Sequence, residues 1–143
     1  MAKRILVPVD GSPQSERALE HALSEYSDAE VVVLYVIDPA SAAYDSPMTA
    51  GPVGVEEWYE NAEQNGKEIF EAAQERADEY DITLDTAIEV GQPARTITEY
   101  AEETGTDQIV IGSHGRSGVT RILLGSVAET VVRRAPCPVT VVR

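Results

Sequence analysis

The chain has 143 residues and is 43% apolar, which favours a single folded domain over residues 1–143 and argues against a disordered acidic chain. Its 25 acidic residues outnumber 11 basic ones, and the net charge of −14 argues against nucleic-acid binding, which requires a basic surface. No apolar run approaches the roughly 18 residues of a membrane span, and the N-terminus shows no secretion signal. The sequence therefore predicts a cytoplasmic protein that binds neither nucleic acid nor a membrane.

The excess of acids has two interpretations. Lysine occurs only twice, at Lys3 and Lys67, and arginine supplies the other basic residues. Acid-rich, lysine-poor surfaces resemble those of proteins from salt-accumulating cells, where molar salt screens the repulsion between like charges. An ordinary solvated acidic surface explains the same composition, so a halophilic origin is a hypothesis.

Short apolar runs alternate with amphipathic segments along the chain. Residues 4–10 predict a buried strand, and Ser12 followed by Pro13 predicts the start of a helix. Residues 30–38 predict a second strand, while residues 39–54 have no periodicity and predict a mobile connection, which leaves open a lid. The later predicted elements are a helix at 55–80, a strand at 82–91, a helix at 92–105, a strand at 107–112, a helix at 126–135 and a strand at 138–143.

This alternation predicts an α/β fold with an open five-stranded parallel sheet and helices on both faces. In such sheets ligands bind beyond the carboxyl ends of the strands, where the direction of winding reverses. The alternation does not give the strand order. If the first and fourth strands are neighbours, the turns that follow them face each other across one crevice.

The segment GSHGRSGVTRILLGS, residues 112–126, joins the fourth strand to the last helix. Its glycines permit a tight turn and a close approach of the backbone to a ligand. Ser126 and Glu129 match the S-x-x-E capping box, so Ser126 is predicted to cap the helix. The first amides of that helix, including Val127, favour an anion. Further donors or positive charges come from Ser113, His114, Ser126 and either Arg116 or Arg121.

The glycine spacing excludes two common nucleotide-binding loops. The sequence has no Gly-Lys-Ser/Thr, and Gly112, Gly115 and Gly118 do not have the dinucleotide spacing. The pattern is instead Gly112, two residues, Gly115, nine residues, Gly125 and then Ser126. Together with ILVPVDGS near the start and VLYVIDP in the second strand, it closely resembles the ATP-binding branch of the universal stress protein family. The resemblance covers nearly the whole chain.

That resemblance implies a sheet order of 3-2-1-4-5, ATP as the ligand and a homodimer formed through the last strand, 138–143. It leaves open whether Mg²⁺ is required. The first loop is expected to lie along the nucleotide, a backbone position of the second strand to hold adenine, and the glycine loop to hold ribose and phosphates. With the donors of the loop, the expected nucleotide-binding residues are Pro8, Val9, Asp10, Val36, Gly112, Ser113, His114, Gly115, Arg116, Gly125, Ser126 and Val127.

Two of these side chains have alternative roles. Asp10 is expected to contact the ribose, or a bound Mg²⁺ or its water, and the structural alternative is an Asx-type cap of the first helix. His114 is expected to donate to a phosphate. No acid is placed in the sequence to orient it as a base, so no catalytic residue is predicted.

Three functions remain open at this point. The leading hypothesis is an ATP-dependent binding module in stress response or signalling, whose protein partner the sequence does not identify. A slow ATP hydrolase needs a positioned water and charge stabilisation, and no complete set of residues for them is visible. A structural dimer with an idle site is the third, and the intact glycine spacing counts against it.

Overall fold

Five parallel strands form one sheet in the order β3-β2-β1-β4-β5, which confirms the predicted fold class and order. The computed structural model describes residues 2–41, 52–114 and 124–143. The strands are β1 (Arg4–Val9), β2 (Glu30–Ile37), β3 (Asp85–Val90), β4 (Gln108–Gly112) and β5 (Val139–Val142). The chain therefore winds from β1 outward to β3, crosses back to β4 and ends at the opposite edge of the sheet.

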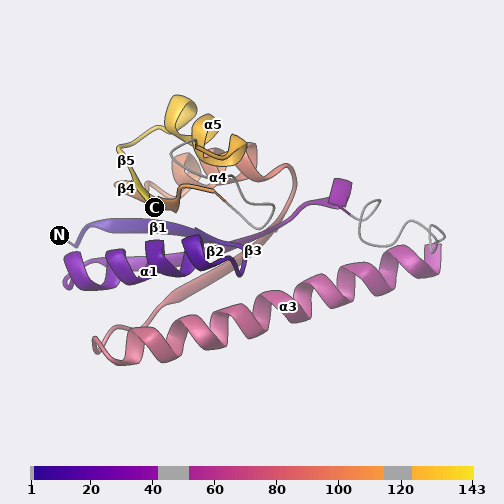
Figure 1. Cartoon of the computed structure of the whole chain (residues 1–143), viewed down its shortest axis with the longest axis horizontal. Coiled ribbons are helices and arrows are strands. Elements are labelled where there is room, and N and C mark those ends of the chain that lie inside the picture. The colour runs from indigo at the N-terminus through magenta and orange to yellow at the C-terminus, as the bar shows by residue number, and fades with distance from the viewer. Residues whose placement is uncertain (1, 42–51, 115–123) are drawn as a thin grey trace.

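In the described part of the chain, two α-helices cover each face of the sheet (Figure 1). One face carries α1 (Pro13–Glu25) and the long α3 (Pro52–Asp78), and the other carries α4 (Pro93–Glu103) and α5 (Ser126–Arg134). Side chains of a strand alternate between the two faces, so β1 contributes residues to the hydrophobic core on each face of the sheet. Ile5 and Val7 pack with α1 and α3, while Leu6 between them packs with α4 and α5.

The segment predicted to lack regular structure, residues 39–54, is structured at both ends. Pro39–Ser41 forms a short 3₁₀ helix, η1, and α3 begins at Pro52. The predicted lid falls largely on residues 42–51, outside the described residues. The prediction of an irregular connection is wrong at both ends, because each proline begins a helix, where its fixed φ is favourable.

Gly66 occupies the middle of α3, where a glycine costs helix stability. A Cβ at this position would lie 2.7 Å from Cδ2 of Tyr35 in β2. The glycine therefore lets α3 lie against the Tyr35 ring, and Asn65 Nδ2 donates to the hydroxyl of the same tyrosine over 3.2 Å. Packing against β2 explains a residue that the helical pattern by itself disfavours.

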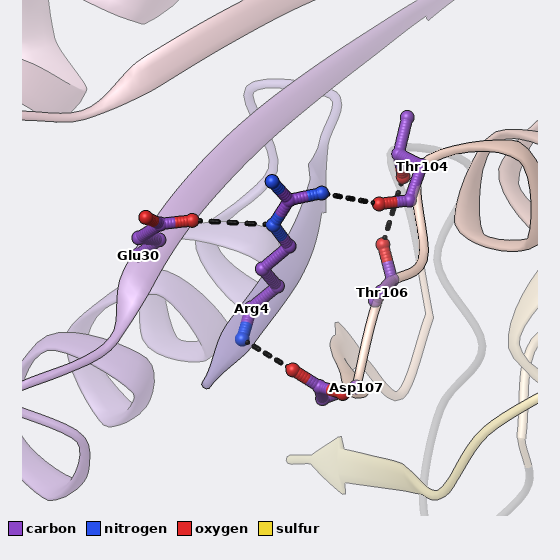
Figure 2. A network of polar contacts seen from close by, with 5 residues as sticks. All are labelled: Arg4, Glu30, Thr104, Thr106 and Asp107. Atoms are coloured by element: carbon purple, nitrogen blue, oxygen red, sulfur yellow. Dashed lines mark hydrogen bonds and ion pairs between the residues drawn. The ribbon is translucent and has the colours of Figure 1, made fainter. Parts of the chain in front are cut away.

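The amino ends of the strands are joined by Arg4, as Figure 2 shows. Its backbone N–H donates to Asp107 Oδ2 over 2.8 Å, and its guanidinium donates to Glu30 Oε2 and to the Thr104 carbonyl over 3.2 and 2.6 Å. The Arg4–Glu30 pair is half exposed, so its contribution to stability is small. These bonds connect the strands at their amino ends. Ligands in this type of fold bind at the opposite, carboxyl ends of the strands.

Candidate functional site

The winding of the sheet reverses between β1 and β4, which are neighbours. The two strands pair at Ile5↔Gln108 and Leu6↔Ile109. Pro8 follows two residues later and has no N–H to extend a ladder. The carboxyl ends of β1 and β4 therefore lead into two turns at the point where open α/β sheets bind ligands.

The turn after β1 is held by its own side chains. Ser12 Oγ accepts from the Ser15 N–H over 3.1 Å and caps α1, as predicted, with Pro13 at the first helical position. The Ser12 N–H in turn donates to Asp10 Oδ1 over 2.9 Å, which is an Asx-type turn. Asp10 thus has the structural role considered as its alternative, and its contact with a ribose or metal stays a prediction.

Gly112 brings the first turn of α1 against the end of β4. A Cβ on Gly112 would lie 2.8 Å from the carbonyl carbon of Gln14 and 2.9 Å from its carbonyl oxygen. Those are backbone atoms, which cannot yield as a flexible side chain does. The glycine is therefore required by contact between two protein segments. Gln14 also lies at the site, and no local pattern in the sequence predicts it.

The two ends of the glycine loop meet directly. The Gly125 N–H donates to the Ser113 carbonyl over 2.7 Å, and the Ser113 N–H donates to the Val142 carbonyl of β5 over 2.8 Å. A Cβ on Gly125 would lie 3.0 Å from His114 Cα. Residues 112–114 and 125–127 consequently form one compact wall, which faces the β1–α1 turn through Gly112.

The predicted capping box of α5 is wrong. The N-cap residue is Gly125, in extended conformation, and among the described residues no side chain makes a capping hydrogen bond to the first turn. Ser126 is already the first helical residue, and the Glu129 carboxylate pairs with Arg133 over 2.8 Å. The bond from Gly125 to Ser113 holds Gly125 extended at the cap position, so the helix begins one residue earlier than the local pattern predicts. The first amides of α5 are left available to an anion at the positive end of the helix dipole.

The other predicted site residues lie around this wall. Pro8 and Val9 are buried at the end of β1, and Val36 is half-buried near the end of β2, paired with Glu89 of β3. The His114 ring nitrogen Nδ1 lies 3.1 Å from Ser113 Oγ. Gly115 and Arg116 lie outside the described residues. The structure thus brings together the β1–α1 turn and both ends of the glycine loop, with Val36 on the neighbouring strand.

The described residues contain no group of three His, Cys, Asp or Glu side chains that could hold a metal ion. Burial, with a smaller effect of Asp107, raises the pKa of the Cys137 thiol, so that thiol stays protonated at neutral pH. Within the same residues, no helix combines the length and apolar character of a membrane span. The helix start of α5 lies at the carboxyl ends of the strands, with its dipole favourable to an anion.

The chain is similar to known proteins over its whole length. A model of the universal stress protein family matches residues 1–143. Universal stress protein MJ0531 of Methanocaldococcus jannaschii is 39% identical over an alignment of 145 positions, which covers 99% of this chain and 82% of that protein.

Solved structures agree with these sequence matches. The structure of MJ0577, a hypothetical protein of the same archaeon, has a TM-score of 0.82 and 32% identity, covering 99% of this chain and 96% of that one. A universal stress protein in complex with cAMP has a TM-score of 0.71 and 28% identity, with 99% and 97% covered.

Proposed function

Because the chain belongs to the universal stress protein family, we propose that it binds ATP between the β1–α1 turn and the start of α5 and acts as a nucleotide-dependent binding module. One observation carries the proposal: the first turn of α5 begins on Gly125 without a side-chain cap. Backbone amides at such a helix start are a ready phosphate site. The cAMP complex of a relative supports an adenine nucleotide as the ligand class.

The residues predicted from the sequence have defined places in this proposal. Phosphates lie on the amides of Ser126 and Val127, and Ser113 and His114 add donors at the other end of the loop. The adenine lies toward Val36 and the end of β1, and the ribose lies beside Asp10. Gly115 and Arg116 belong to the same proposed loop, and any Mg²⁺ would be held mainly by the phosphates, with Asp10 as the protein's contribution.

Binding without efficient hydrolysis is the expected activity. The described contact of His114 is with the Ser113 hydroxyl, and a general base is normally oriented by a further acceptor such as a carboxylate. Phosphoryl transfer to water needs a positioned water and charge stabilisation as well. We therefore infer a turnover well below the enzyme median of about 10 s⁻¹.

The test begins with freshly purified protein, which is denatured so that any released nucleotide can be identified by its mass. Calorimetry then compares the affinities of nucleotide-free protein for ATP, AMP, cAMP and NAD. Phosphate release from ATP is measured over hours. Saturable ATP binding with slow or absent turnover supports the proposal. No adenine nucleotide at all would leave the site idle, and rapid turnover would make the protein a hydrolase.

We further propose a homodimer through β5. This edge strand is Val-Thr-Val-Val without a charge, whereas β3 at the other edge carries Asp85 and Glu89. Charges on an edge strand oppose pairing, so β5 is the edge suited to an antiparallel partner strand across a two-fold axis. Val141→Pro is expected to give a monomer in light scattering, and Val90→Pro on β3 is the matched control that leaves the dimer intact. A wild-type monomer at tens of micromolar would contradict the proposal.

We also propose that the protein works in a salt-rich cytoplasm. The chain carries 14 more acidic than basic residues, and dilute buffer leaves their repulsion unscreened. Its melting temperature is expected to rise between low and molar KCl. A flat or falling trend would favour the alternative of an ordinary acidic surface.

A further inference from the structure

A cavity of about 300 Å³ lies between α1 and α3, the two helices on the face opposite α4 and α5 (Figure 1). It extends from the β1–α1 turn along both helices as far as Arg76. This volume is at the small end of the range for ligand pockets. No residue of α5 or of the described ends of the glycine loop lines this cavity, which shares Val9 and Asp10 with the proposed nucleotide site.

The floor of the cavity is apolar. Val9, Leu19 and Ala73 are buried there, and Ala72 and Ile69 continue the apolar surface along α3. The two alanines leave space where larger side chains would fill the gap between the helices. This floor suits the methylene groups of a small ligand.

One end of the cavity is closed by the β1–α1 turn. Gly11 has a φ of +82°, a left-handed conformation that favours glycine, and a Cβ there would lie 3.3 Å from Ile69 Cδ1. The turn therefore packs directly on α3. The cavity is a built feature of three packed segments, because the turn, α1 and α3 all contribute to its wall.

The rim of the cavity is acidic. Asp10, Glu16 and Glu68 line it together with Arg76, so the lining carries three carboxylates and one guanidinium, a net charge of −2. The Arg76 guanidinium is already paired, at 3.3 Å from Glu16 and 3.6 Å from Glu20, which lies outside the lining. Glu68 has no hydrogen bond or ion pair to any other residue in the described part of the chain. An anion is disfavoured here, and a cation finds in Glu68 a carboxylate that no described residue neutralises.

We propose that this cavity binds a small organic cation, an alkylammonium or short diamine. Its methylene body lies on the floor formed by Leu19, Ile69 and Ala72, and its ammonium group pairs with Glu68 at the rim. The combination of an apolar floor and an unpaired carboxylate selects such a molecule over an inorganic cation, which gains nothing from the floor, and over a phosphate, which the rim repels. The proposal is independent of nucleotide binding.

The experiment titrates the full chain with 1,4-diaminobutane and with 1,4-butanediol, a neutral molecule of the same length, by calorimetry at low ionic strength. Saturable one-to-one binding of the diamine and none of the diol is expected. Glu68→Gln is expected to lower the affinity for the diamine about threefold, which corresponds to the free energy of an exposed ion pair. Ala72→Phe, at an exposed position of the cavity wall, is expected to abolish binding by filling the space.

Nonspecific attraction of the diamine to the acidic surface is the competing explanation. A matched variant distinguishes it from binding in the cavity. Glu102→Gln removes the same charge from an exposed position of α4 on the opposite face and is expected to leave the affinity unchanged. Equal affinities of the Glu68→Gln and Glu102→Gln proteins would overturn the proposal, as would diol binding as tight as diamine binding or no saturable binding. If Ala72→Phe fails to fold in circular dichroism, the comparison of the two glutamine variants decides by itself.

Discussion

Helices α1 and α5 begin at the same edge of the sheet, after the neighbouring strands β1 and β4, but their first turns differ. In α1 the Ser12 side chain accepts from the first turn, and Pro13 has no N–H to satisfy. In α4, on the same face as α5, Gln92 Oε1 accepts from the Arg95 N–H over 2.7 Å. No described side chain caps the first turn of α5 in this way. A side chain of the protein caps the first turn of α1, whereas the first turn of α5 is the place where we propose that a ligand binds.

The largest effect is expected from a substitution that gives α5 a side-chain cap like that of α1. Gly125→Asp places a carboxylate where it can accept from the first-turn amides, as Ser12 does in α1. Because that carboxylate occupies and repels the phosphate position, ATP affinity is expected to fall about a hundredfold, which is about 2.7 kcal/mol. Calorimetry on the folded variant measures the loss.

Gly125→Ala is the control for this substitution, because it adds a Cβ near His114 without adding a cap or a charge. It is expected to lose much less affinity than Gly125→Asp. ATP binding by Gly125→Asp at the wild-type level would remove the start of α5 from the nucleotide site.

The second test concerns the contact between Gly112 at the end of β4 and Gln14 in the first turn of α1. Gly112→Ala forces a Cβ to 2.8 Å from the Gln14 carbonyl carbon, so α1 or β4 must shift. The free energy of unfolding is expected to fall by about 2 kcal/mol, the cost of overpacking against backbone. Urea denaturation measures it.

Gly105→Ala is the reference for that experiment. A Cβ there meets no atom within 4 Å, but the φ of +65° disfavours alanine, for an expected cost of about 1 kcal/mol. A loss for Gly112→Ala no larger than the loss for Gly105→Ala would mean that the Gln14 contact yields easily.

The third test removes a hydroxyl from each helix start. Ser12→Ala deletes the cap of α1 and is expected to cost about 1 kcal/mol of unfolding free energy. Ser126→Ala deletes a hydroxyl from the first residue of α5, which has no capping bond to lose, and stability should change by less than about 0.5 kcal/mol. Thermal or urea unfolding of the pair checks the difference, and similar losses for both variants would contradict the assignment of caps.

The smallest effect comes from the acid in the first turn of α5. Glu129→Gln removes a negative charge close to the amides proposed to hold phosphates, at the expense of the exposed pair with Arg133. ATP affinity is expected to rise about twofold, because a helix-terminal charge contributes only a few tenths of a kcal/mol in exposed positions. Titrations at low salt resolve a change of this size. A loss of affinity would show that Glu129 supports the bound nucleotide.

The element order and the α1 cap were predictable because both depend on local patterns. Alternating apolar and amphipathic segments give the strands and helices, and Ser12 followed by Pro13 is a helix start in nearly any context. The capping box at Ser126 is an equally good local pattern and was wrong. The Gly125 N–H is engaged by Ser113, twelve residues earlier in the chain, and that bond sets where α5 begins.

The sequence by itself determined that this chain forms alternating strands and helices and that its glycine-rich loop precedes a helix. Those features follow from periodicity and from the conformational preferences of single residues. Only the tertiary structure decided that Gly112 makes room for Gln14, that Gly125 makes room for His114, and that α1 and α3 leave a cavity with an acidic rim. Such contacts join residues far apart in the chain, and they depend on how closely backbones approach after the sheet has formed, which no local pattern encodes.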